Sequence, residues 1–595
     1  MRIFDELYFH YKSTIYEKET FINFSLNLSS ITHLRILSFL RPLVFLILLS
    51  HFVMAQSGFV TYDDDYYHKI ERLEIKSGFL GNTFHDDVKP FERKDIIQFL
   101  DSLKFSDTSL SVVDLANLDY LKADSWAYAS DTAVGKNRKP LWKHFFGHKA
   151  DFYSIKNEDF NIHVNPIFQF GGGSNSGDIE KEGQFINTRG ISVHGTINKK
   201  LGFYTFFTEN QASTPYYIKD YQRQTGGFPY SGFTKIIKDD SVKLGRDYMQ
   251  AMGYFVFKPS KNIKLRFGHS TNFIGSGIRS MILSDFSAPY LNLMINVKMG
   301  RLEYQSLLAS MNNTQVDVGV ANLEPIPSKY MAFHHLNVNV TKKLNIGLFE
   351  TVMFGDRAFD LNYLNPIIFY RFVEGLIGSK DNAIVGADFK LILAKSVSLY
   401  GQFVLDEFNS AESKKEGWYG EKHAGQLGLK YIDFLGLKQF DLQAEFNYAR
   451  PYTYSHYSTY SNTVNYNVPF AHPLGANFKE FLLLARYQPT PKLFIKATWM
   501  KAMKGLDIGD ENWGGNILRS YREDRPDDYG NFIGQGVEQN LSLLRFEAAY
   551  MLGHNFFLDV AYQNRTESYK VLDDKNTSLF DFGIRWNLGN RKPLL

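Results

Sequence analysis

The sequence contains no cysteine, which excludes disulfide bonds, thiolate catalysis, cysteine-ligated zinc and a lipid-modified cysteine anchor. Long apolar runs are also scarce. Only one stretch approaches the roughly 20 residues that a membrane-spanning helix needs. The net charge of +3 is too small, on 595 residues, to indicate nucleic acid as a partner. A helical membrane domain and a nucleic-acid-binding protein are therefore both disfavoured.

Aromatic residues, in contrast, are abundant. They make up 16% of the chain, with 36 Tyr and 52 Phe, although the mean hydropathy is only −0.26. Transmembrane β-barrels combine these two properties, because their strands alternate apolar and polar residues and carry aromatic side chains at the membrane interfaces. The chain is long enough for one large barrel or for several soluble domains.

The single apolar run lies near the N-terminus and reads as an export signal. Two arginines precede an apolar core at 43–49, and the segment ends on the small residue Ala55. This order is typical of a secretory signal cleaved after Ala55, and the core is too short for the alternative, a transmembrane anchor. We expect 1–55 to be leader and signal peptide. The polar residues 1–30 indicate either a mis-assigned start codon or an unusually long leader.

Period-two alternation dominates the chain after about residue 155. In the last segment, one predicted face carries Phe580, Phe582, Ile584, Trp586 and Leu588, and the other carries Asp581, Gly583, Arg585 and Asn587. A helix would mix the two sets around its circumference, whereas a strand separates them. These segments are therefore predicted to be β-strands.

Short polar connections recur between the alternating runs. They lie at 198–200, 259–262, 298–300, 341–343, 394–396, 435–438, 489–492 and 553–555. Eight tight hairpins use sixteen strands, and a first strand near 160–170 and a last near 578–588 bring the number to eighteen. Longer connections lie at 209–247, 311–330, 355–383, 450–477 and 504–540.

Short turns on one side and long loops on the other are typical of outer-membrane barrels, with the short turns periplasmic and the long loops external. The predicted fold class is therefore all-β: a transmembrane antiparallel β-barrel of about 18 strands, over residues 151–595, in the cell outer membrane. A soluble sandwich or propeller would also alternate, but it would not need this asymmetry of loops.

Residues 56–150 differ from the rest. The segments 90–103 and 111–120 have helical spacing of apolar residues, which predicts a small periplasmic helical region. Such a region could cap the barrel mouth, contact a partner or pack against the short turns. It is too small for the plug of a large energy-coupled transporter, whose barrel has 22 strands.

The sequence offers no persuasive catalytic set. It contains no H-E-x-x-H, G-x-S-x-G or P-loop motif. His334 and His335 should point to opposite faces of a strand and so cannot bind one metal together, and Asp406-Glu407 reads as a charged strand end. We therefore expect no enzyme activity, no metal and no cofactor. A barrel hydrolase remains an alternative, because its residues would be brought together only by the fold.

The long loops carry the functional signal. Flat aromatic faces beside amide and charged groups suit sugar rings, which stack their C–H faces and hydrogen-bond through their hydroxyls. The predicted polysaccharide-binding residues are Trp418, Tyr419, Tyr452, Tyr454, His456, Tyr457, Trp513, Arg519 and Tyr521. The competing interpretation is an aromatic girdle with ordinary loop packing.

Five strings also resemble a known family. They resemble an outer-membrane family that contains the gliding-motility protein RemB, and this family is in turn similar to the capsule assembly protein Wzi. The five segments are 363–371, 399–403, 450–456, 471–477 and 528–531. The resemblance implies an eighteen-stranded barrel with a periplasmic helical part, and no enzyme activity. It also implies a surface role in capsule or exopolysaccharide attachment, or in gliding motility.

The expected partners are outer-membrane lipid, surface polysaccharide and the barrel assembly machinery. One departure is that residues 589–595 follow the last predicted strand, so that strand does not finish on a terminal aromatic residue. A diffusion porin, whose lumen would be open, remains the main alternative to a polysaccharide-binding barrel.

Overall fold

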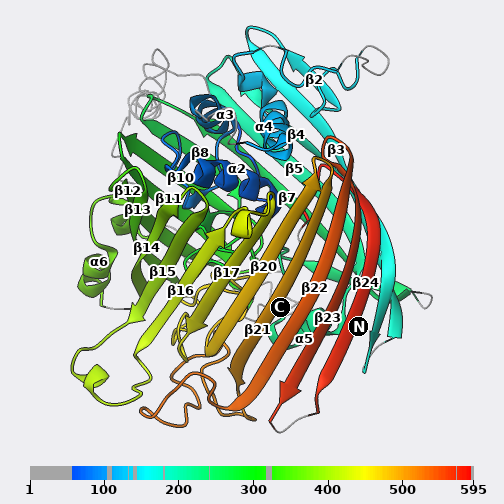
Figure 1. The fold of residues 1–595 in the computed structure, drawn as a ribbon. Coiled ribbons are helices and arrows are strands. Elements are labelled where there is room, and N and C mark those ends of the chain that lie inside the picture. Colours follow the sequence, from blue (N-terminus) through cyan, green and yellow to red (C-terminus); the bar gives the residue numbers. More distant parts are fainter. Residues whose placement is uncertain are drawn as a thin grey trace, which may run out of the picture. The chain divides into compact units, whose positions relative to one another are not determined.

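The computed structural model describes residues 57–103, 110–131, 133–137, 144–178, 181–239, 242–315, 325–378, 380–570 and 573–590. The predicted leader and signal peptide lie outside the described residues. Within those ranges, eighteen strands close into one antiparallel barrel (Figure 1), which confirms the predicted fold class and strand number. The barrel closes where β24 pairs with β3, from Thr577 opposite Gly177 to Trp586 opposite Phe168.

The barrel strands, in order around the wall, are β3 (Phe160–Gly177), β4 (Lys181–Ile197), β5 (Leu201–Ser213), β7 (Val242–Phe257), β8 (Ile263–Ser270), β10 (Tyr290–Met299), β11 (Leu302–Asn312), β12 (Ser328–Asn339), β13 (Leu344–Gly355), β14 (Asn382–Ala394), β15 (Val397–Glu407), β16 (Lys422–Tyr431), β17 (Phe440–Ala449), β20 (Phe478–Thr490), β21 (Leu493–Leu506), β22 (Val537–Gly553), β23 (Phe556–Tyr569) and β24 (Lys575–Trp586). Small additions to the sheet are β2 (Tyr153–Lys156) beside β3 and β6 (Thr234–Asp239) beside β7.

All eight predicted hairpins are present, and they lie at one end of the barrel with the start of β3 and the end of β24. We call this the short-turn end. The long connections lie at the opposite, long-loop end (Figure 1). They include α5 (Tyr216–Thr225) and the small ribbon β18 (Val464–Asn465) with β19 (Val468–Pro469). The connection that contains α6 (Tyr370–Leu376) instead folds back along the outer face of the wall, where the Tyr370 N–H donates to Glu350 of β13 at 2.7 Å (Figure 1).

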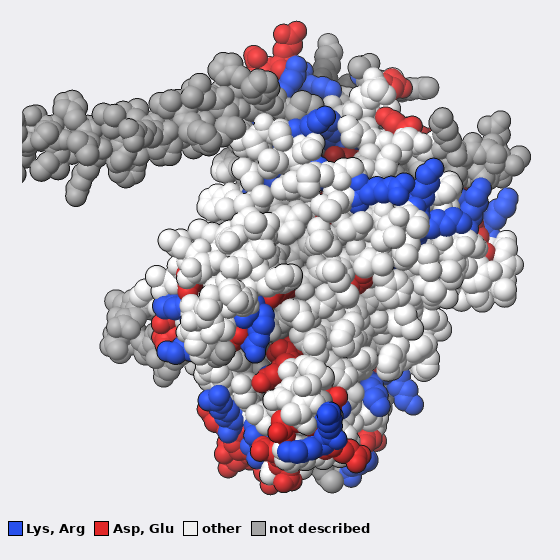
Figure 2. All heavy atoms as spheres, turned by 90° about the vertical axis from the view of Figure 1, so that its left-hand side faces the viewer, with Lys and Arg blue, Asp and Glu red and all other residues white. Residues whose placement is uncertain are grey.

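Alternation along the strands separates lipid-facing from luminal side chains. On β24, Phe580 and Phe582 point outward and are 44% and 56% exposed, whereas Arg585 on the other face is buried. The face drawn in Figure 2 shows a broad band almost free of charged residues between charged ends. An apolar band of this kind is what the hydrocarbon core of a membrane requires.

One residue leaves the predicted face. The sequence places Leu588 beside the outward residues of β24, but the strand ends at Trp586 and Asn587 has a φ of 53°. This left-handed residue redirects the chain, and Leu588 packs against the luminal core instead. Residues 587–590 therefore return into the barrel.

Within its described residues, the N-terminal region contains three α-helices, α2 (Asp64–Ser77), α3 (Arg93–Ser102) and α4 (Val112–Asp124). The last two confirm the predicted helical segments, and Ser111 starts α4 with a capping box. The sequence analysis missed α2, which begins at the N-cap Asp63 and buries Tyr67 and Ile70 in the core of this region. Among the described helices, none is both long and apolar enough to cross a membrane.

This region lies within the short-turn end of the barrel rather than outside it. Its short strand β1 (Val88–Lys89) pairs with β9 (Phe273–Ile274), which belongs to the connection between β8 and β10. Its carboxylates pair with inward-facing basic residues of the wall: Glu74 and Asp86 with Lys390, Glu71 with Lys430, Asp64 with Arg486, Asp65 with Lys496, and Glu92 with Lys258 and Lys264. The region therefore occupies part of the lumen, so we call it the plug.

Candidate functional site

Three long connections bring five of the predicted aromatic residues together at the long-loop end. Tyr419 follows β15, Tyr452, His456 and Tyr457 follow β17, and Tyr521 follows β21. The ring centroids of Tyr419 lie 6.3 Å from Tyr452 and 6.0 Å from Tyr521. The centroid of His456 lies 5.9 Å from Tyr521 and 4.2 Å from Tyr457. We call these five residues the outer cluster.

Basic side chains cover the outer cluster. Lys422 Nζ lies 4.2 Å from the ring centroid of Tyr521. The guanidinium carbons of Arg522 and Arg525 lie 4.2 Å and 3.5 Å from the centroids of Tyr457 and Tyr419. Cation–π contacts of this kind contribute about 0.5–2 kcal/mol each, depending on how far the cation is desolvated. The outer cluster is therefore both aromatic and basic.

The members of the outer cluster differ in their exposure. Tyr452, His456 and Tyr521 are buried, and Tyr419 and Tyr457 are half-buried. Arg522, which lies over the cluster, is exposed. Burial and the nearby Lys422 and Arg522 lower the pKa of His456 to about 3, so this imidazole is neutral at physiological pH. The surface that a ligand could reach is thus the Tyr457 and Tyr419 rings with their arginines, supported by the buried rings beneath.

Three of the other four predicted residues have structural partners elsewhere. Tyr454 points into the lumen, where its hydroxyl donates to the Met281 carbonyl at 2.6 Å. Trp513 Nε1 donates to Glu511 at 3.2 Å, and Arg519 pairs with Asp507 at 3.1 Å. The fourth, Trp418, is buried beside the outer cluster, with its ring centroid 5.5 Å from that of Tyr419. The structure therefore brings together six of the nine residues, the outer cluster and Trp418. Their assignment to polysaccharide stays a prediction.

The residues considered for chemistry lie as expected. On β12, His335 faces the lumen and bonds to Asp388 at 2.7 Å, while His334 lies on the other face within 3.3 Å of Glu350. At the end of β15, Glu407 pairs with Lys422 at 3.0 Å. These contacts agree with the interpretation of the two pairs as structural.

A luminal segment that the sequence analysis missed is the connection 271–289 between β8 and β10. It folds into the barrel, where Glu445 of β17 accepts hydrogen bonds from the backbone N–H groups of Ile278 at 2.7 Å and Arg279 at 3.0 Å. One feature of the sequence could have indicated that this connection enters the lumen. The strand before it, β8, has only eight residues, fewer than the 9–11 of a typical spanning strand, so the chain leaves the wall early.

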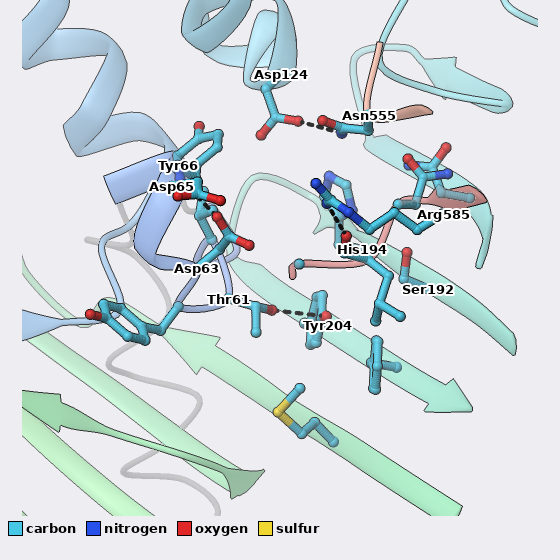
Figure 3. Close-up of a pocket in the computed structure, with 18 of the residues that line it drawn as sticks. Thr61, Asp63, Asp65, Tyr66, Asp124, Ser192, His194, Tyr204, Asn555 and Arg585 are labelled. Carbon is cyan, nitrogen blue, oxygen red and sulfur yellow. Dashed lines mark hydrogen bonds between the residues drawn. The ribbon is translucent and has the colours of Figure 1, made fainter. Parts of the chain in front are cut away.

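Among the cavities inside the described part of the barrel, two lie next to each other along one side of the lumen. The first has a volume of about 210 Å³ and lies between the plug and the inner wall (Figure 3). There Thr61 donates to the Tyr204 hydroxyl at 3.0 Å, and Asn555 donates to Asp124 at 3.3 Å. The second has a volume of about 230 Å³ and lies between α5 and strands β3–β5, β7 and β22–β24.

Beside the first cavity, Asp151, His163 and His194 have ligand atoms within 4.8 Å of one another. Burial opposes the ionisation of Asp151, but hydrogen bonds from His163 at 2.7 Å and Trp126 at 2.6 Å hold its pKa below the ordinary value. The His163 and His194 rings are parallel, 1° apart in angle, with centroids 4.5 Å apart. Parallel rings cannot both aim an in-plane lone pair at one ion, so the arrangement favours a hydrogen-bonded stack.

Comparison with known proteins now adds to this geometry. The family model of the capsule assembly protein Wzi matches residues 171–579, which is more than half of the chain. The chain belongs to the Wzi family. The predicted similarity to Wzi is thereby confirmed, and the protein is an outer-membrane β-barrel. The matches do not bear on the RemB part of the resemblance, which stays a prediction.

Among solved structures, the chain is similar to Escherichia coli Wzi, described as a carbohydrate-binding outer-membrane β-barrel involved in group 1 capsule assembly. The identity is 13% and the TM-score 0.53, and the match covers 90% of this chain and 100% of that chain. Pseudomonas aeruginosa OccK8 (OprE) matches at 8% identity and a TM-score of 0.38, over 71% of this chain and 98% of that chain. No curated protein sequence matches the chain.

Proposed function

We propose that this protein is a non-enzymatic outer-membrane barrel that holds exported capsule or exopolysaccharide at the cell surface. The observation that carries the proposal is the outer cluster, where three loops converge on one aromatic and basic surface. Membership of the Wzi family supports it, since the E. coli protein is described as carbohydrate-binding. In this orientation the long-loop end faces the medium and the short-turn end faces the periplasm.

The chemistry of the outer cluster suggests how a polymer would be held. A sugar ring would stack on the half-buried Tyr457, with Arg522 placed to hydrogen-bond its hydroxyl or carboxylate groups. Acidic sugars should bind most strongly, because the exposed Arg522 lies over the Tyr457 ring. The other two cations are already paired, Lys422 with Glu407 and Arg525 with Asp528. Polysaccharide attached in this way would also provide traction for gliding, the role that the resemblance to RemB implies.

The contents of the lumen oppose the porin alternative. Among the described residues, the plug and the connection 271–289 both lie across the interior, and both are tied to the wall by buried hydrogen bonds and ion pairs. A wide diffusion pore would need this space to be filled with water. We therefore expect low conductance in planar bilayers.

The test is a deletion strain complemented with variant genes. We expect Tyr457→Ala combined with Arg522→Ala to release stained polysaccharide from the cell surface into the medium, while the barrel remains folded in the outer membrane. Tyr529→Ala is a matched control, because this exposed tyrosine lies on the same end outside the outer cluster. Unchanged retention and unchanged surface spreading in the double variant would contradict the proposal, and so would hydrolysis of the polysaccharide by the purified protein.

A further inference from the structure

The two luminal cavities adjoin and follow one side of the wall. Five residues line both of them: Tyr230, Gln250, Ala549, Leu588 and Gly589. The first cavity lies at the short-turn end beside α2, and the second reaches α5 in a connection of the long-loop end. We call the two cavities together the luminal passage.

Small inward residues create the luminal passage. Gly171 of β3 lies opposite Gly583 of β24, and Ala561 of β23 and Ala549 of β22 continue the same inner face. Elsewhere the inner wall carries long buried side chains such as Lys390. A third cavity, of about 280 Å³, lies between the plug and strands β8 and β10, and it shares no lining residue with the other two. Each cavity is many times larger than the roughly 10–15 Å³ that one enclosed water needs.

The second cavity is lined mostly by apolar residues, and among its polar groups the neutral ones outnumber the charged ones. Gln563 donates to the Tyr217 hydroxyl at 3.1 Å, and Gln250 donates to the Tyr230 carbonyl at 3.1 Å. Gln563 Oε1 also accepts from Arg545 at 3.0 Å. Each of the two amides keeps a second N–H donor, since an amide group has two. Side-chain amides beside tyrosine rings are the groups that bind sugar hydroxyls and sugar faces.

Two buried hydroxyls in the luminal passage have no hydrogen-bond partner among the described residues. Tyr66 Oη lines the first cavity and is 7% exposed, and Thr214 Oγ1 lines the second and is 6% exposed. A buried hydroxyl left without a partner costs about 1–3 kcal/mol. One such group in each cavity offers a hydrogen bond to a polar guest.

The charged residues that line the luminal passage favour an uncharged sugar over an acidic one. Seven carboxylates and four lysine or arginine side chains line the two cavities within the described part of the chain. The three arginines among them are already paired with carboxylates, as Arg93 is with Asp124 and Arg585 with Asp559, so the lining offers an acidic sugar little uncompensated positive charge. An uncharged saccharide needs no such counter-charge. The outer cluster has the opposite character, because the exposed Arg522 lies over one of its rings.

We propose that the luminal passage is a second saccharide-binding site, which takes a short uncharged segment of a glycan chain. The position of the passage is independent of the proposed function of the outer loops, whereas the choice of a saccharide rests on it. The outer cluster and the luminal passage then differ in the charge of the sugar that each accepts.

The absence of native cysteine permits a direct test in the full-length protein. Ala561→Cys places a single thiol in the second cavity, and Ala411→Cys places one on an exposed loop as the matched control. A small methanethiosulfonate reagent should modify both thiols. Cellobiose, maltose and chitobiose serve as neutral probes, and a galacturonic acid dimer serves as the acidic probe. We expect at least one neutral disaccharide to slow modification at 561 by about threefold or more, with no effect at 411.

Three results would overturn the luminal site. The first is a thiol at 561 that does not react in a folded barrel, as judged by heat-modifiable mobility, because no path would then reach the passage. The second is reaction at 561 that no neutral disaccharide slows, or that the acidic dimer slows equally. The third is protection at 561 that disappears when Tyr457→Ala and Arg522→Ala are added, because the effect would then belong to the outer cluster. Persistence of protection in that background supports the luminal site even if surface retention is lost.

Discussion

Replacement of Arg72 by alanine tests how strongly the plug is held in the barrel. The Arg72 side chain is 3% exposed, and its guanidinium contacts three carboxylates. Nε bonds to Asp114 of α4 at 2.9 Å, while the two terminal nitrogens bond to Asp433 and Asp441 beside and on β17. One side chain therefore joins two plug helices to the wall of the barrel.

The free-energy cost of Arg72→Ala depends on the charged groups that remain after the substitution. Removing one partner of a buried ion pair typically costs about 3–5 kcal/mol, because the other charge stays buried without compensation. Two features favour the lower value. Lys76 still pairs with Asp114 at 2.5 Å and with Asp433 at 3.0 Å, and Asp433 is 22% exposed. A loss of about 3 kcal/mol increases the population of the open plug roughly 150-fold, since about 1.4 kcal/mol corresponds to a factor of ten.

The assay is limited proteolysis of the intact protein in detergent, with cleavage sites within 57–103 identified by mass spectrometry. When opening and closing are fast compared with cleavage, the rate of cutting follows the open population. We therefore expect Arg72→Ala to accelerate cutting roughly 150-fold. The exposed pair of Lys122 and Asp101, at 2.7 Å, provides the control, because Lys122→Ala should cost no more than about 1 kcal/mol. Cutting of Arg72→Ala within fivefold of wild type would refute this account of the plug.

Three further predictions concern the plug, the lumen and the lipid face. Burial opposes ionisation of Glu92, but two lysines lower its pKa from 4.5 to about 2. The ionised Glu92 therefore stabilises the plug above about pH 4.5, and this stabilisation is lost as the pH falls towards 2. Amide hydrogen exchange in the plug should become faster over that pH range, and Glu92→Gln should abolish this pH dependence. Glu445→Ala should release the 271–289 connection and raise single-channel conductance in planar bilayers, whereas unchanged conductance would place the constriction elsewhere. Phe580→Arg on the lipid face should cost about 2–4 kcal/mol in urea unfolding from liposomes, and a loss below 1 kcal/mol would contradict its outward position.

The barrel could be predicted from the sequence because its signals are local. Each strand shows its two faces within about ten residues, and each hairpin is marked by a few polar residues between two alternating runs. The eight predicted turns and the closure of the first strand on the last therefore required no long-range information. Leu588 shows the limit of this reasoning. In the sequence, the alternation of apolar and polar residues continues to Leu588, but the left-handed conformation of Asn587 ends the strand before it.

The contents of the lumen could not be predicted in the same way. The plug is held by pairs such as Glu74 with Lys390, which are 316 positions apart, and neither residue has a local pattern that names its partner. The outer cluster was predicted only in part for a related reason. Tyr452 and Tyr454 lie in the same tyrosine-rich run, but one joins the outer cluster and the other turns to Met281 inside the barrel. The composition of the sequence identifies this loop, but only the fold shows which of its tyrosines join the outer cluster and which point into the lumen.

The inward-facing charges connect the plug to the function of the barrel. A barrel of eighteen strands is wide enough for a water-filled lumen, in which inward lysines and arginines would need no partners. Here Lys390 is fully buried and Lys430 nearly so, and both pair with carboxylates of the plug, so the wall and the plug neutralise each other. Removing either would leave buried charges without partners, which is far more costly than the loss of a surface pair. A barrel stabilised in this way is built to stay closed across most of its lumen. Its rigidity then supports the long loops at the other end, where the outer cluster requires three separate connections to keep their relative positions.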